Sequence, residues 1–220
     1  MKAVKQFLIT GVIRLLRSKS ECLLLVLWPF LIVGFMRAGA VPWQTFPLAL
    51  LAAAGMQIAV TVGYDYGRAR ETGALHRLLV TGVSPVLLFA GINGSRIIAF
   101  LASGALAILL ARLFGIEVHG VTLILALGAA AVIYASVGLL VYRCMRSALG
   151  VLSAAPIVLL ILCLPSFAPL RHWPGAVVYA SPVSTMAALS VKPSLWGAVA
   201  ALGWIACSAV GIGALVIRKK

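Results

Sequence analysis

The sequence predicts an all-α integral membrane protein, with six transmembrane helices in one domain that covers residues 1–220. Three observations predict this class. Apolar residues make up 63% of the chain and charged residues only 10%. The mean hydropathy is +1.14. The apolar residues form repeated runs that approach the roughly 20 residues needed to cross a hydrocarbon core. We therefore expect the lipid bilayer as the solvent and a helical bundle as the fold.

The first segment, residues 1–19, has the pattern of a helix that lies along a membrane surface. Its apolar residues repeat at helical spacing, while Lys2, Arg14 and Arg17 fall on the opposite face. Basic residues on the polar face favour the anionic inner leaflet. This segment is therefore predicted to be an interfacial helix.

Six apolar runs follow. The predicted spans are 22–36, 47–64, a third within 86–114, 121–142, 148–164 and 195–217. In the third run, Asn93-Gly94-Ser95-Arg96 is expected to interrupt the helix, so that the crossing part begins near Arg96. Arg96 and Arg112 can then snorkel toward opposite interfaces. Residues 165–193 contain five prolines and only a half-length apolar piece, which predicts a re-entrant segment on the outer side.

The positive charges test this layout independently of hydropathy. With the N-terminus inside, 14 of the 18 Lys and Arg residues fall on the inner side. The outer set is Arg37, Arg112, Arg171 and Lys192. Lys and Arg in short loops are retained in the cytoplasm. The layout therefore predicts a multi-pass protein of the cytoplasmic (inner) membrane with both termini cytoplasmic.

Several classes of function are not supported. The net charge of +14 lies in short loops between apolar runs and forms no basic face of a folded domain, so we expect no nucleic acid partner. The four cysteines make no CxxC or Cys/His cluster, which argues against a metal site. No catalytic constellation and no GxxxxGK[ST] loop is present. We expect no enzyme activity and no cofactor bound by this chain.

A polar stretch at 65–85 lies between the second and third predicted spans. It contains Glu71, Leu75, Leu78 and Leu79 at helical spacing, before Ser84-Pro85, and predicts a short cytoplasmic helix. The stretch resembles the signature of type 2 ABC transporter permeases, the transmembrane subunits of ABC exporters. The matching positions are Glu71, Gly73, Leu75, Leu78, Leu79, Thr81, Val83 and Ser84. His76 departs from the family's usual acid, and Gly82 departs from its frequent proline.

The resemblance implies a function and a set of partners. The short helix would be a coupling helix seated in a separate ATPase subunit, which would bind ATP and magnesium. The residues implied in this coupling are Arg70, Glu71, Gly73, Leu75, Leu78 and Leu79. A second permease subunit, identical or different, would complete a dimer. Candidate residues lining the pathway are Met56, Gln57 and Thr61, for which helix packing is an equally good interpretation.

The hypothesis is thus a transport subunit of an ATP-driven exporter that moves an amphipathic substrate, such as a drug, a peptide, or a lipid-linked or haem-like molecule. Two alternatives stay open. A secondary transporter would require ionisable residues within the membrane or inverted repeats. A non-catalytic membrane assembly factor would require neither.

Overall fold

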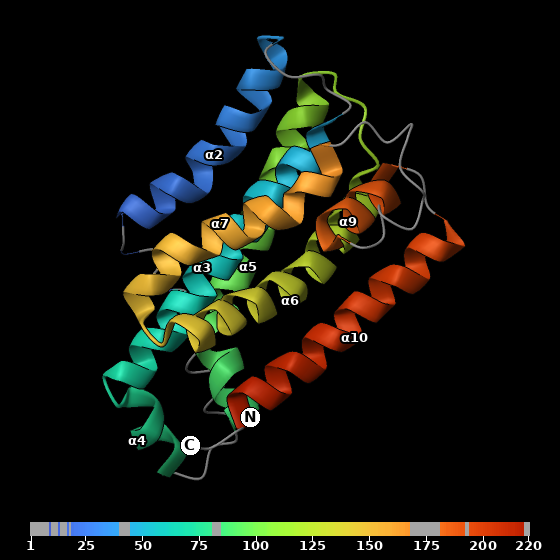
Figure 1. Ribbon diagram of the computed structural model, residues 1–220. Helices are drawn as coiled ribbons and strands as arrows, with labels where there is room; N and C mark the ends of the chain where they lie inside the picture. The colour runs from blue at the N-terminus through green and yellow to red at the C-terminus, as the bar shows by residue number, and fades with distance from the viewer. Residues whose placement is uncertain are drawn as a thin grey trace.

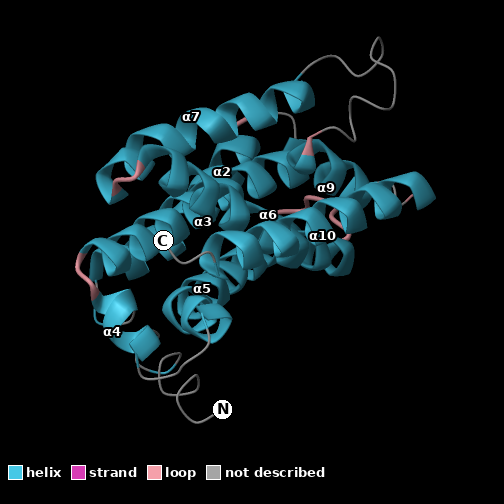
Figure 2. Ribbon diagram, turned by 60° about the horizontal axis from the view of Figure 1, so that its bottom comes forward, coloured by secondary structure: helices cyan, strands magenta, loops and turns pink. Residues whose placement is uncertain are grey.

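A computed structural model describes residues 9, 13, 17, 19–39, 45–80, 85–167, 181–191 and 194–217 of the chain. Within these residues every regular element is a helix (Figure 2). The longer helices are α2 (Lys19–Arg37), α3 (Phe46–Glu71), α5 (Pro85–Leu113), α6 (Gly120–Met145), α7 (Ala148–Phe167) and α10 (Leu195–Ile217). Two short helices, α4 (Ala74–Val80) and α9 (Pro182–Val191), complete the described bundle.

The long helices run back and forth between two ends of the molecule (Figure 1). We call the end that carries α4 the α4 end; it also holds the turn between α6 and α7 and the C-terminal end of α10. The opposite end holds the end of α2, the start of α3 and the loop between α5 and α6. Helices α6 and α10 both run toward the α4 end, and α7, which lies between them in the sequence, runs in the opposite direction.

Four described helices are long and apolar enough to cross a membrane: Phe46–Glu71, Asn93–Leu113, Gly120–Met145 and Leu195–Ala214. The chain is therefore a helical membrane protein with four candidate spans, and the prediction of six is corrected. The apolar parts of the other two predicted spans are the shorter segments Leu25–Arg37 and Ala148–Cys163.

Other boundaries differ from the sequence prediction in instructive ways. Helix α3 continues through Asp65, Arg68 and Arg70 to Glu71, because Arg68 and Arg70 are exposed and Asp65 forms an ion pair with Arg96. Helix α5 is continuous through residues 93–96, so the predicted interruption is wrong. Asn93 and Ser95 are buried there, and packing overrides their weak helix propensity.

Two predicted segments are described only in part. Of the interfacial helix at 1–19, Ile9, Ile13, Arg17 and Lys19 are helical and the rest lies outside the described residues. Of the predicted re-entrant segment at 165–193, residues 168–180, 192 and 193 lie outside them. Its described part includes α9, whose ten residues pack among α3, α6, α7 and α10. The Ser181 hydroxyl, just before α9, donates to the Leu162 carbonyl of α7 at 2.5 Å.

The core of the bundle is a close seam between α3 and α6. Gly55 on α3 faces the ring of Tyr134, and Gly67 faces the ring of Tyr142. Between them, a Cβ on Gly63 would lie 2.6 Å from the carbonyl oxygen of Gly138. Small residues four apart let two helix backbones approach closely, the common packing mode of helices in membranes. The seam fixes α3 in the centre, where its other faces meet α5 and α7.

Candidate functional site

A cavity of about 470 Å³ lies between α2, α3, α5 and α7. Its size falls within the roughly 300–1,000 Å³ typical of small-molecule sites. The wall from α3 contains Met56, Gln57 and Thr61, the three residues predicted to line a pathway, which the structure brings together here. They lie within six consecutive residues on α3, and Met56 is 39% exposed. Helix α5 adds Phe100 to the opposite wall.

Most of the cavity wall is apolar. Leu25 comes from α2, Leu152 and Pro156 come from α7, and Phe100 stacks on Trp28 of α2 with ring centroids 6.0 Å apart. The Thr61 hydroxyl donates to the Gln57 carbonyl of its own helix at 2.7 Å. Such a bond satisfies the Thr61 donor within the helix. The wall formed by these residues therefore suits an apolar group.

One part of the cavity is ionic. Arg96 Nε of α5 lies 3.1 Å from Asp65 Oδ2 of α3, and both residues line the cavity. The two side chains are only 22% and 24% exposed. Asp65 precedes the end of α3 by six residues, or about 9 Å of helix rise. The pair therefore marks the part of the cavity nearer to the α4 end.

A second guanidinium contacts the cavity wall from an exposed position. Arg68 Nη1 donates to the Tyr64 hydroxyl at 3.2 Å, and Tyr64 itself lines the cavity. Among the described lining residues, the ionic part thus holds one carboxylate and one guanidinium, and the exposed Arg68 reaches the wall only through Tyr64. Charged groups at membrane depth are costly and are usually paired or functional.

At the α4 end, a tight turn connects α3 to α4. Gly73 has φ +68°, and its N–H donates to the Arg70 carbonyl at 3.1 Å. A glycine in this left-handed conformation ends a helix without steric cost. The Arg77 guanidinium of α4 donates to the Thr72 carbonyl at 3.2 Å. These bonds hold α4 in one orientation relative to α3.

Glu71 has a contact that its position in the sequence does not reveal. Its carboxylate accepts a hydrogen bond from the Ala148 N–H at 2.6 Å, and Ala148 is the first residue of α7. A carboxylate at a helix N-terminus is stabilised by the free N–H groups and by the helix dipole. The last residue of α3 is thereby joined to the start of α7.

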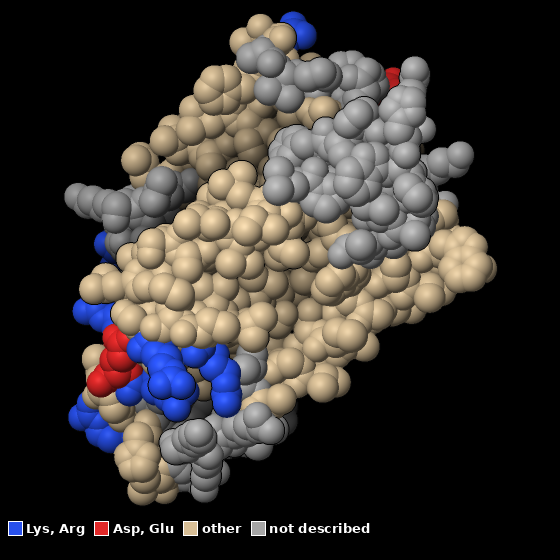
Figure 3. Space-filling model, in the orientation of Figure 1, with Lys and Arg blue, Asp and Glu red and all other residues tan. Residues whose placement is uncertain are grey.

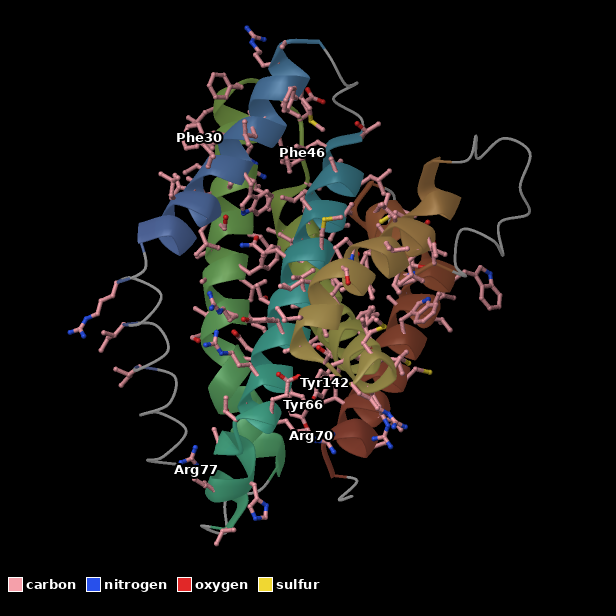
Figure 4. All side chains as sticks on the ribbon, turned by 60° about the vertical axis from the view of Figure 1, so that its left-hand side comes forward. Phe30, Phe46, Tyr66, Arg70, Arg77 and Tyr142 are labelled. Atoms are coloured by element: carbon pink, nitrogen blue, oxygen red, sulfur yellow. The ribbon has the colours of Figure 1, made fainter. Side chains whose placement is uncertain are left out.

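Arg70, also predicted in the coupling set, lies beside an aromatic pair (Figure 4). The rings of Tyr66 on α3 and Tyr142 on α6 meet edge to face, with centroids 6.0 Å apart and an interplanar angle of 80°. Arg70 itself is exposed. On α4, the side chains of Leu75, Leu78 and Leu79 lie outside the described part of the structure. His76, Arg77 and Val80 are exposed, Val80 by 74%.

Sequence reasoning missed the ion pair and the Glu71 contact. Arg96 was predicted to be able to snorkel toward an interface, and in the structure it pairs with an acid 31 positions away. The sequence feature that could have predicted this pair is an acid near the end of the second span together with a base near the start of the third.

Among the described residues, no group of three or more His, Cys, Asp or Glu could hold a metal ion. No family model, curated protein or solved structure matches the chain.

Proposed function

We propose that this protein is the transmembrane subunit of an ATP-driven exporter similar to the type 2 ABC permeases, and that a separate ATPase docks on α4. The observation that carries the proposal is α4 itself. It is a short helix with an exposed surface, held by a two-residue turn at the end of the central helix α3. A partner that moves α4 therefore also moves the core of the bundle.

The distribution of charge supports a cytoplasmic position for α4. Described basic side chains gather around the α4 end, where Figure 3 shows a dense patch of Lys and Arg. The residues at this end are Arg68, Arg70, Arg77, Arg143 and Arg146. Arg37 and Arg112 belong to the opposite end. Because basic residues in short loops stay in the cytoplasm, the α4 end would face the compartment that supplies ATP and magnesium.

The contacts also supply a route from α4 to the cavity. The turn at Thr72 and Gly73 fixes α4 to α3, and the Glu71 carboxylate fixes α3 to the start of α7. Both α3 and α7 contribute walls to the cavity. A displacement of α4 by ATP-driven closure of the partner would thus change the shape of the space that holds an amphipathic substrate. A second permease subunit remains part of this proposal through the family resemblance.

Copurification tests the proposal. Tagged protein extracted from its native membrane in mild detergent should bring down a nucleotide-binding subunit with magnesium-dependent ATPase activity. Val80→Glu on α4 should abolish this association with the fold intact, because Val80 is 74% exposed. The matched control is Val121→Glu, since Val121 is also 74% exposed but lies at the start of α6, at the opposite end. Absence of any ATPase from the wild-type preparation contradicts the proposal.

One observation favours a second candidate, a secondary transporter. The partly buried Asp65–Arg96 pair is the kind of ionisable group through which a proton gradient can be coupled to transport. Vesicle transport assays separate the two mechanisms. An exporter requires ATP and the partner subunit, whereas a secondary transporter works without either and stops when the proton gradient is collapsed. Transport of neither kind would favour the membrane assembly factor.

A further inference from the structure

The charges around the cavity give a first criterion for the ligand. Asp65 is the one acid among the described residues that line it, whereas Arg96 lines it and Arg68 contacts its wall through Tyr64. The two charges in the wall balance each other, and the exposed Arg68 guanidinium adds a positive charge next to the wall. The Arg96 side chain is only 22% exposed, and a guanidinium partly shielded from water attracts an anion more strongly than one on an exposed surface.

The apolar part of the cavity wall gives a second criterion for the ligand. Leu152 and Pro156 of α7 face the volume from one side and Phe100 of α5 faces it from another. Burying apolar groups against such walls is favourable, so a small inorganic anion would leave most of the 470 Å³ without a matching partner. The described residues therefore fit a molecule with an apolar body and an anionic end.

The route of entry is consistent with such a molecule. The cavity is bounded by separate helices, α2 and α7, and Met56 in its wall is 39% exposed. Both α2 and α7 carry exposed apolar side chains, among them Phe30 and Leu160, as expected for helices that face lipid. An amphiphile in the bilayer could therefore reach the cavity from the side without crossing bulk water.

We propose that this cavity binds a single-chain amphiphile with an anionic head group, a carboxylate or a phosphate monoester, and that Arg96 binds the head group in place of the Asp65 carboxylate. The inference deepens the proposed function because it names a substrate class. Its test needs no ATPase, so the site and the exporter can fail separately. A guanidinium forms strong, often bidentate bonds with either head group.

Photolabelling tests this site directly. Full-length protein is reconstituted into phosphatidylcholine vesicles and irradiated with a long-chain fatty acid that carries a diazirine and an alkyne. Labelled peptides are then mapped by mass spectrometry. Labelling should concentrate on the α3, α5 and α7 walls of the cavity. Palmitate and lysophosphatidic acid should compete. Palmityl alcohol and inorganic phosphate should not, which separates an amphiphile from a free anion.

Two variants distinguish ligand binding from a structural role of the ion pair. Arg96→Gln should reduce labelling by about tenfold or more, the size expected for losing a hydrogen bond to a charged group. Asp65→Asn removes the competing carboxylate and should increase labelling. If the pair only holds α3 to α5, both variants disrupt it and labelling changes in the same direction. Opposite directions support the proposal, and equal losses overturn it.

A third variant keeps the test decisive if Arg96→Gln does not fold. Ala99→Phe fills the cavity without removing a charge, since Ala99 lies in its wall, and should abolish labelling by the acid. Arg143→Gln removes a positive charge at the same end but outside the cavity wall, and should leave labelling unchanged. Labelling spread evenly over exposed apolar surfaces such as α10, or equally strong with the alcohol probe, overturns the proposal.

Discussion

At the scale of single residues, charged side chains near the α4 end connect helices that are distant in sequence. Asp65 joins α3 to α5 through Arg96, and Glu71 joins α3 to α7 through the Ala148 N–H. Both acids therefore have bonding partners within the described bundle. This changes the interpretation of Glu71: a loss of coupling on its substitution would follow equally from a detached α7.

Replacing Glu71 by alanine should lower the free energy of unfolding by about 1 kcal/mol, the usual cost of removing a helix cap and its dipole interaction. Glu71→Gln keeps an oxygen acceptor but no charge, so its loss should be smaller. Urea unfolding in mixed micelles measures both. Glu117→Ala, an exposed acid at the opposite end, is the control. Equal stability of Glu71→Ala and wild type would show that this bond contributes nothing.

Part of the residue-level picture could be predicted from the sequence. Met56, Gln57 and Thr61 on the second span were named as candidates because the family resemblance implies that this span lines the pathway, and all three line the cavity. The partners of Asp65 and Glu71 are 31 and 77 positions away. Such pairs depend on which helices are neighbours and on how far along the bundle axis each residue lies. Helical periodicity carries no information about either.

At the scale of elements, the closeness of α3 and α6 is the organising feature. A Cβ on Gly138 would overlap the carbonyl group of Ala59, and a Cβ on Gly63 would lie 2.6 Å from the Gly138 carbonyl oxygen. Both obstacles are backbone atoms, which cannot rotate away as a side chain can. The seam therefore depends on having no side chain at these two positions.

Gly138→Ala should destabilise the protein by about 2–3 kcal/mol, in the range for overpacking a tight contact. The control lies on the same helix: Gly128 has nothing within 4 Å of a built Cβ. There, alanine should be neutral or stabilising by about 0.5–1 kcal/mol through its higher helix propensity. Thermal unfolding in detergent compares the pair. A similar effect at both positions would mean that α3 and α6 are not in close contact.

Element boundaries were predictable where hydropathy alone decides them. The last predicted span, 195–217, has the bounds of α10, since one uninterrupted apolar run determines both ends. Helix α5 was mispredicted at residues 93–96 because Asn, Gly and Ser weaken an isolated helix. In the bundle, Asn93 is buried and Ser95 is only 3% exposed. Tertiary packing therefore keeps the helix continuous despite the weak helix propensity of these residues.

At the scale of the whole molecule, hydropathy and charge carry different information. Hydropathy predicted six spans, whereas four described helices have the length and composition to cross a membrane. In the two exceptions, α2 and α7, the described apolar segments are the shorter Leu25–Arg37 and Ala148–Cys163. The charge asymmetry concerns the ends of the bundle, and it therefore does not depend on the number of spans.

Chemical labelling of cysteines should place the two ends on opposite sides of the membrane. Cys144 is exposed near the end of α6, at the α4 end, whereas Glu117 is exposed in the loop between α5 and α6, at the opposite end. In a background without other cysteines, a membrane-impermeant maleimide should modify Glu117→Cys in intact cells. It should modify Cys144 only after permeabilisation, because an excess of basic residues favours the cytoplasmic side. The reverse pattern would invert the orientation and remove α4 from the reach of ATP. Modification of both sites from outside would contradict the bundle's transmembrane placement.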